Sequence, residues 1–167
     1  GGHCIPIDPL YLSWKMKSVK YNARIIDLAS EINTNMPRHV VERVQDVLNE
    51  KGKALRGSRL LVVGVAYKPD IGDTRESPSL DVIGLLRGKG AQVSYFDPFV
   101  PAIEHEGWGM TSEPDLLAAA HRADCVVIVT HHSAIDYRAL VEAAAVVFDT
   151  RNAVGAAGIQ DAKVIRL

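Results

Sequence analysis

The chain has little cysteine, few aromatic residues and no excess of charge of either sign. Among its 167 residues there are two cysteines and 6% aromatic residues, and 19 basic residues balance 20 acidic ones. Two cysteines cannot form a disulfide framework, so we expect a protein of the reducing cytoplasm rather than a secreted scaffold. Without a basic stripe or an acidic tail, neither nucleic acid nor a membrane surface is an expected partner. No apolar run approaches the ~20 residues that a membrane span needs.

The second part of the chain has the pattern of an α/β domain. Hydrophobic residues make up 47% of the chain, which is ordinary for a globular protein. From residue 58 onwards, short apolar runs alternate with helical patterns, which predicts a mostly parallel sheet covered on both faces. We therefore expect a Rossmann-like three-layer domain that follows a helical arm. Its expected strands are 59–64, 92–97, 125–130, 145–149 and 163–166, and its expected helices are 78–89, capped by Ser77, 113–121, capped by Ser112, and 134–144.

The first part of the chain has the pattern of helices without a core. A short helix is expected over 10–20, and apolar residues at offsets of three and four predict a longer amphipathic helix over 25–48. Pro37 lacks the helical N–H donor, which predicts a kink or break there. These helices cannot enclose a core, so we expect a partner chain or another part of the same protein to cover them. Three aromatic residues at helical spacing are expected to pack rather than to bind a ligand: Tyr11, Trp14 and Tyr21.

The opening stretch, G-G-H-C-I-P-I-D-P, places a thiol close to a carboxylate. Gly1 and Gly2 permit unusual backbone geometry and close approach of a ligand. The two prolines favour extended backbone before them, which predicts that Cys4 and Asp8 lie on a stiff loop rather than on a helix face. A lone cysteine is more often buried filler. A thiol near a carboxylate on such a loop is more typical of a nucleophile beside a group that orients water or accepts a proton.

Residues that follow strands are the next candidates, because ligands of such sheets bind beyond the carboxyl ends of the strands. The 64–77 stretch retains only Gly64 of the G-x-G-x-x-G fingerprint, and it replaces the short turn with a 14-residue loop. Its Lys68 and Arg75 suit a phosphate ligand. A salt-bridged surface loop is an equally weighted interpretation. Arg151 follows a later strand and is expected at the same edge, where a binding and a purely structural role are evenly matched.

The remaining polar candidates are interpreted as structural. Asp97 ends a strand where dinucleotide-binding domains place a ribose carboxylate, but without the fingerprint we favour a turn residue. His131 and His132 follow another strand, and adjacent side chains point apart, so a shared metal is not expected. Cys125 lies in an apolar run and is expected to be buried packing. The sequence therefore predicts no metal site.

Together these stretches resemble the UDP-glucose/GDP-mannose dehydrogenase family. G-G-x-C-x-P-x-D is similar to the catalytic-cysteine loop of that family. G-V-A-Y-K-P-D-I-G-D-T-R-E-S-P is similar to the first loop of its C-terminal domain, which binds the nucleotide sugar, and Y-F-D-P and F-D-T-R-N resemble two later signatures. The histidine form of the opening motif, followed by Y-L-S-W-K, is most similar to the UDP-N-acetylhexosamine branch.

The resemblance implies an NAD-dependent, two-step oxidation of the sugar's 6-hydroxyl to a carboxylate. It implies that Cys4 is the nucleophile that forms a thioester and that Asp8 assists the water or proton steps. Gly1 and Gly2 are implied to shape the substrate loop. Many relatives carry lysine where this chain has Ile7, so any cofactor contact of that lysine is lost or replaced here.

The resemblance also implies different roles for two parts of the chain. Residues 1–57 correspond to the catalytic-cysteine loop and the central helices through which the family forms homodimers, and 58–167 to the UDP-sugar-binding domain. Lys68 and Arg151 are implied to hold the nucleotide end of the substrate, and Arg75 to reach the NAD. Because the NAD-binding domain of the family precedes these regions, we expect a C-terminal portion that is inactive alone. The alternative is a stand-alone nucleotide-binding or oligomerisation module without redox activity.

Overall fold

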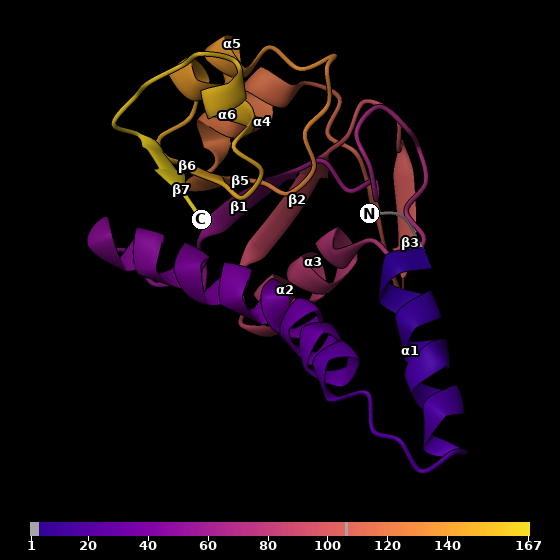
Figure 1. Ribbon diagram of the computed structural model, residues 1–167. Helices are drawn as coiled ribbons and strands as arrows, with labels where there is room; N and C mark the ends of the chain where they lie inside the picture. The colour runs from indigo at the N-terminus through magenta and orange to yellow at the C-terminus, as the bar shows by residue number, and fades with distance from the viewer. Residues whose placement is uncertain (1–3, 106) are drawn as a thin grey trace.

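The computed structural model describes residues 4–105 and 107–167 and has a five-stranded parallel sheet at its centre (Figure 1). The strand order is β2-β1-β5-β6-β7, and every neighbouring pair is parallel, as the alternation of strands and helices predicts. The strands of this sheet are β1 (Arg59–Val63), β2 (Gln92–Phe96), β5 (Cys125–Ile128), β6 (Val147–Asp149) and β7 (Val164–Arg166).

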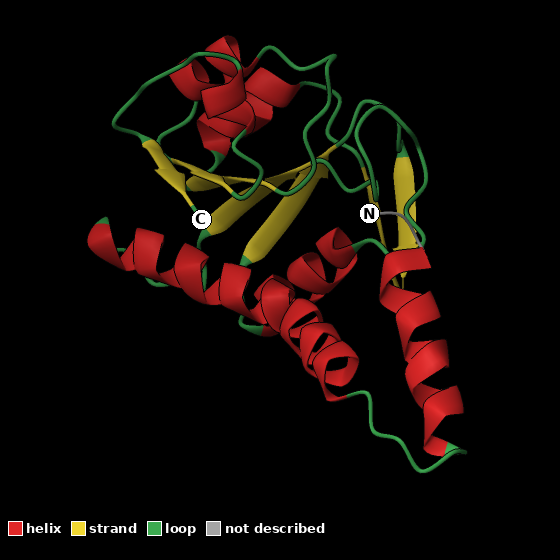
Figure 2. Ribbon diagram, viewed as in Figure 1, coloured by secondary structure: helices red, strands yellow, loops and turns green. Residues whose placement is uncertain are grey.

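Helices cover both faces of the sheet, which gives the three layers seen in Figure 2. Helices α2 and α3 lie on one face, and α4, α5 and α6 lie on the other. The expected Rossmann-like architecture is therefore confirmed. The helices are α1 (Cys4–Lys17), α2 (Arg24–Glu50), α3 (Pro78–Gly88), α4 (Leu116–Arg122), α5 (Tyr137–Ala143) and α6 (Ala153–Ala156). No helix in this described part of the chain combines the length and apolar character that crossing a membrane requires.

Side-chain alternation along the strands divides the core into two clusters. In β1, Leu60 and Val62 belong to the cluster under α2 and α3, whereas Leu61 and Val63 belong to the cluster under α4 and α5. A strand that is buried on both faces has to be apolar at every position, which explains its unbroken apolar run. Cys125 lies in the first cluster, and burial raises the pKa of its thiol to about 12. Its predicted role as core packing is confirmed.

Of the kink or break predicted at Pro37, the break is wrong. Helix α2 runs from residue 24 to residue 50 as one helix. A proline removes one backbone hydrogen bond and crowds the preceding turn. The residues that follow compensate for this, because they are buried against the sheet and α3: Val40, Val41, Val44, Val47 and Leu48. Half of the helix that the sequence assigns to an arm is thus part of the core.

From Cys4 onwards the opening stretch is helical, so the stiff loop predicted for Cys4 and Asp8 is wrong. Helix α1 begins at Cys4, and Pro9 lies inside it. Pro6 falls in the first turn, where a backbone N–H has no helical acceptor in any case, so only Pro9 costs a hydrogen bond. Cys4 and Asp8 are therefore one helical turn apart.

The aromatic residues of the arm are exposed, contrary to the prediction that they pack. Tyr11, Trp14 and Tyr21 are 68%, 64% and 57% exposed, although the first two rings lie 5.6 Å apart. The amino-terminal half of α2 is similar, with Ile25 at 84% and Ile32 at 58%. The arm thus presents an uncovered apolar surface, which the lack of core-forming sequence predicted.

Two elements and two helix starts differ from the expected ones. An antiparallel hairpin, β3 (Ala102–His105) and β4 (Trp108–Thr111), was not predicted, nor was the short helix α6. Helix α4 begins later than expected, because Asp115 rather than Ser112 caps it by accepting the N–H groups of residues 117 and 118. Asp136 caps α5 in the same way. The expected cap of α3 by Ser77 is confirmed.

Candidate functional site

The candidate site lies at the carboxyl edge of the sheet, where the strand order reverses. After β1 the chain crosses to β2 on one side, and after the hairpin and α4 it returns to β5 on the other side of β1. In open parallel sheets this switch point opens a crevice between the loops that follow the two strands. Here these loops are 64–77 after β1 and 129–136 after β5.

The two loops touch at their first residues. Gly64 has a φ of +82°, and a Cβ atom there would lie 2.0 Å from the backbone oxygen of Thr130. The hydroxyl of Thr130 donates a 2.7 Å hydrogen bond to the carbonyl of Ala66. Glycine is thus required at the end of β1, both by its conformation and by the close approach of the neighbouring loop.

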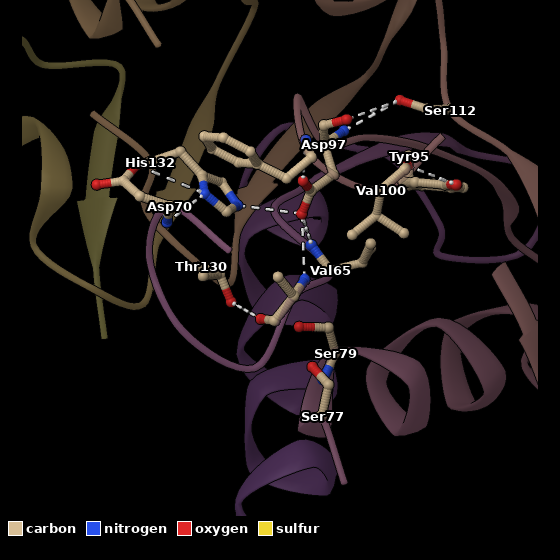
Figure 3. A network of polar contacts seen from close by, with 12 residues as sticks. Val65, Asp70, Ser77, Ser79, Tyr95, Asp97, Val100, Ser112, Thr130 and His132 are labelled. Atoms are coloured by element: carbon tan, nitrogen blue, oxygen red, sulfur yellow. Dashed lines mark hydrogen bonds and ion pairs between the residues drawn. The ribbon is translucent and has the colours of Figure 1, made fainter. Parts of the chain in front are cut away.

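Asp97, at the end of β2, holds the start of the 64–77 loop by hydrogen bonds. Its Oδ2 atom accepts the backbone N–H groups of Val65 at 2.8 Å and Ala66 at 3.1 Å, and its Oδ1 atom accepts that of Phe99 at 2.8 Å (Figure 3). Burial would raise the pKa of this carboxyl, but the hydrogen bonds from His132 and the three amides outweigh it and hold the pKa below its ordinary value. Asp97 is a turn residue, as predicted, and it also connects three loops.

His132 lies between Asp97 and Asp70 and is completely buried (Figure 3). Its Nδ1 atom accepts the backbone N–H of Asp70 at 3.0 Å, so that nitrogen carries no proton. The Nε2 atom, 3.0 Å from Asp97 Oδ2, therefore carries the proton and donates it. The network requires one neutral tautomer. His131 is exposed, so the two side chains diverge as expected, and the described residues contain no cluster suited to a metal ion.

A second bond closes the contact between the two loops. The Oδ1 atom of Asp70 accepts the backbone N–H of Ser133 at 2.7 Å. This bond is the main reason that the pKa of the Asp70 carboxyl is lowered. Asp70 also has a φ of +61°, which is unusual for a residue other than glycine. We refer to the contacts of Asp70 with His132 and Ser133 as the Asp70 clamp.

The predicted cations differ in their surroundings. Arg75 is held by Asp73 in a two-pronged ion pair, with Nε and Nη2 3.0 Å and 2.8 Å from its carboxylate oxygens. This pairing raises the pKa of the guanidinium, and it confirms the salt-bridged interpretation for this part of the loop. Lys68 and Arg151 are exposed, and neither side chain has a hydrogen bond or ion pair within residues 4–105 and 107–167. Asp149 positions the latter by accepting its backbone N–H at 2.9 Å.

Only part of the opening motif lies within the described residues. Gly1 and Gly2 lie outside the described residues, and so does the side chain of Cys4. Asp8 is exposed on α1, and no hydrogen bond or ion pair in the described structure joins it to the cations at the edge. The topology thus places Lys68 and Arg151 after strands of one sheet edge, whereas Asp8 lies on helix α1.

Two pockets of the described structure lie elsewhere. One, of about 270 Å³, lies along β1, β2 and α4, and the other, of about 360 Å³, lies between α2, α3 and the hairpin. Neither is lined by a predicted site residue. The sequence analysis missed the pairing of Asp97 with His132. Both residues follow strand ends on the same edge, and that position was the signal that could have joined them.

These features define a Rossmann-like α/β domain with two exposed cations at its carboxyl edge, neither of which has a partner among the described residues. A family model described as the UDP binding domain of the UDP-glucose/GDP-mannose dehydrogenase family matches residues 61–156, more than half of the chain. The model of the central domain of that family matches residues 1–35. The chain therefore belongs to the UDP-glucose/GDP-mannose dehydrogenase family, as its motifs indicated.

Individual relatives agree with this assignment. The chain is 37% identical to the UDP-N-acetyl-D-mannosamine dehydrogenase of Methanococcus maripaludis over 80% of its own length and 29% of the relative. It is 30% identical to the UDP-N-acetyl-D-glucosamine 6-dehydrogenase of Salmonella typhi over 79% and 31%. The solved UDP-D-ManNAc dehydrogenase of Pyrococcus horikoshii matches 99% of this chain and 37% of its own, with a TM-score of 0.78 and 26% identity. The chain spans less than a third of the length of these two curated relatives.

Proposed function

We propose that this chain binds the UDP portion of a nucleotide sugar at the carboxyl edge of its sheet, as the UDP-binding part of a sugar 6-dehydrogenase. The observation that carries the proposal is the pair of exposed, unpaired cations, Lys68 and Arg151, on loops that leave β1 and β6. These strands flank β5, so the two loops project from the same edge. The family assignment of residues 61–156 supports the same ligand.

The two cations suit a diphosphate in different ways. Lys68 offers a compact ammonium with three donors, and Arg151 offers a planar fork that donates to two phosphate oxygens at once. Arg75 is less suited to this role, because Asp73 already occupies its guanidinium. Its proposed contact with NAD requires that ion pair to open.

The oxidation itself is proposed for the longer protein. There the resemblance assigns the thioester-forming nucleophile to Cys4 and the assisting carboxylate to Asp8. The described residues do not fit a dinucleotide of their own, because the 64–77 loop replaces the glycine-rich turn and buries the start of α3 at Ser77 and Ser79. We therefore derive no step through NAD from this chain.

Titration calorimetry with UDP tests the proposed ligand. One charge-assisted hydrogen bond contributes about 1.5–3 kcal/mol, so Lys68→Met and Arg151→Met should each raise the Kd for UDP roughly 10- to 100-fold. Lys89→Met is the matched control, because Lys89 is exposed at the far end of α3, and its Kd should equal that of the unsubstituted chain. The proposal is wrong if the unsubstituted chain does not bind UDP, or if all three variants bind it equally.

A binding module without redox activity is the competing function. It is supported by the lack, within the described residues, of any hydrogen bond or ion pair between Asp8 and the cations at the edge. To distinguish the two, the chain is joined to the NAD-binding domain of a relative and assayed for NADH with a UDP-sugar. If Cys4 is the nucleophile, Cys4→Ala blocks the second oxidation, so the sugar carboxylate is not formed, and leaves the affinity for UDP unchanged. A module without redox activity forms no NADH with either version.

We also propose that the arm pairs with a second copy of the chain. The uncovered apolar side chains of α1 and the first half of α2 support this, since exposed patches of this kind mark interaction sites. Light scattering after size exclusion should then give twice the chain mass. Ile25→Glu, on the exposed half of α2, should give the single mass, whereas Ile71→Glu, on the 64–77 loop, should not. A monomer without substitution would contradict the proposal.

A further inference from the structure

We propose that His132 is a positioning residue for the nucleotide: its Nδ1 atom holds the 64–77 loop through Asp70 and so places Lys68. The inference rests on the proposed binding of UDP at this edge. Lys68 is two residues from Asp70, and the loop has no secondary structure of its own between β1 and α3. The place of Lys68 therefore depends on where this part of the loop is attached.

One buried pair attaches the loop at two points. Asp97 accepts the amides of Val65 and Ala66, at the root of the loop, while His132 accepts the amide of Asp70 further along. Because Asp97 and His132 are also hydrogen-bonded to each other, both points of the loop are attached to the same buried pair (Figure 3). Lys68 lies between these two points in the sequence.

The position of the imidazole is fixed by its surroundings. Its ring is fully buried, and the ring of Phe99 lies 5.2 Å away. Its backbone N–H donates to the hydroxyl of Tyr137 at 2.9 Å, which fixes the residue at the main chain as well. Since Asp97 accepts from Nε2, Nδ1 is left as the acceptor for the loop. The Asp70 clamp thus joins the loops that follow β1 and β5, and Lys68, which is exposed, remains available to the nucleotide.

Two substitutions separate the loop attachment from the general stability of the pair. The Oδ1 atom of asparagine occupies nearly the place of Nδ1, so His132→Asn retains the acceptor for Asp70 and loses the bond to Asp97. The Nε2 atom of glutamine occupies nearly the place of the imidazole Nε2, so His132→Gln retains the bond to Asp97 and loses the bond from the Asp70 amide, while the bond from Ser133 to the Asp70 carboxylate remains. His132→Asn loses the buried bond to the Asp97 carboxylate and His132→Gln loses the partly buried bond from the Asp70 amide, so His132→Asn should lower the urea midpoint at least as far as His132→Gln.

The affinity for UDP should differ between them. Loss of the bond from the Asp70 amide should raise the Kd of His132→Gln roughly five- to tenfold above that of His132→Asn. Equal Kd values for the two variants would overturn the inference and leave the proposed function intact, provided that the unsubstituted chain binds UDP. If that chain does not bind UDP, the proposed function fails, and the inference fails with it.

A second measurement needs no substitution at the buried site. If the attached loop is the binding form, UDP should slow hydrogen exchange of the Asp70 amide, because the ligand stabilises the state in which that N–H is bonded to His132. The amide of Ala119, inside α4 on the far side of the sheet, is the internal control and should not respond. An Asp70 amide whose exchange is unchanged at saturating UDP overturns the inference, whether or not the variants fold.

Discussion

Replacement of Gly64 by alanine should destabilise the chain by more than its backbone conformation alone explains. At a φ of +82° a residue with a Cβ costs about 1–2 kcal/mol. The added Cβ would also lie 2.0 Å from the carbonyl oxygen and 2.7 Å from the carbonyl carbon of Thr130. These are backbone atoms, so no rotamer change relieves the overlap, and the end of β1 has to separate from the loop after β5. Overpacking of this kind costs typically 1–3 kcal/mol more. The total expected loss is roughly 2–5 kcal/mol.

Gly57 provides a control at nearly the same backbone conformation. Its φ is +83°, and nothing lies within 4 Å of the Cβ that alanine would add. Gly57→Ala should therefore cost only the conformational part, about 1–2 kcal/mol. Urea unfolding followed by far-UV circular dichroism at pH 7 gives both values, provided that the two variants share one m-value. Their difference measures the contact with Thr130.

Equal losses for the two variants would refute the reasoning, because they would show that the two loops separate without cost. The affinity for UDP provides a second comparison. Gly64→Ala displaces the root of the loop that carries Lys68 and should weaken UDP binding, whereas Gly57→Ala should leave it unchanged. Weaker binding by both variants to the same extent would point to general destabilisation instead.

Three further outcomes follow from single contacts. Asp115→Ala removes the cap of α4 and should lower the free energy of unfolding by about 0.5–2 kcal/mol in urea; an unchanged midpoint would contradict the assigned cap. Tyr95→Phe removes the buried 3.1 Å hydrogen bond to the carbonyl of Val100 and should cost about 1–2 kcal/mol, with no change in far-UV dichroism. Asp97 and Asp70 have lowered pKa values in the folded chain, so their stabilisation is present above about pH 4 and is lost as the pH falls through the folded values. Urea midpoints should thus agree at pH 7 and pH 5 and drop at pH 3, and an equal midpoint at pH 3 would contradict this account.

The parallel sheet could be predicted from the sequence because burial on both faces leaves a strong local signal. Apolar runs such as 59–64 and 125–130 have no polar alternation, and helical patterns separate them. The hairpin at 102–111 left no such signal, since its strands are four residues long and one contains Gly109. The opening helix was missed for a different reason. Prolines near a helix start cost little, so their general preference for extended neighbours misled the prediction.

The candidate site could be predicted as far as the carboxyl edge, but not in its internal connections. Position after a strand identified Lys68 and Arg151, because the topology alone brings such residues to one edge. The link between Asp97 and His132 depends on which neutral tautomer the imidazole adopts and on amides from a distant loop. These are properties of the folded packing. A buried histidine and an exposed one have the same local sequence signal, as the neighbouring His131 shows.

Helix α2 connects the arm to the sheet, and Pro37 is the position at which this helix could have been interrupted. The proline costs about 3 kcal/mol in a helix interior. Each buried valine after it contributes roughly 1.5 kcal/mol or more, and four of them lie between 40 and 47, so burial outweighs the cost and the helix continues. Its second half is therefore fixed beneath the sheet, while its first half presents Ile25 and Ile32 to the surroundings. A partner that covers this exposed half is held at a set distance and orientation from the sheet, because one unbroken helix connects the two. A break at Pro37 would have let the arm move independently of the sheet. Because the helix is continuous, the position of the sheet fixes the position of the arm.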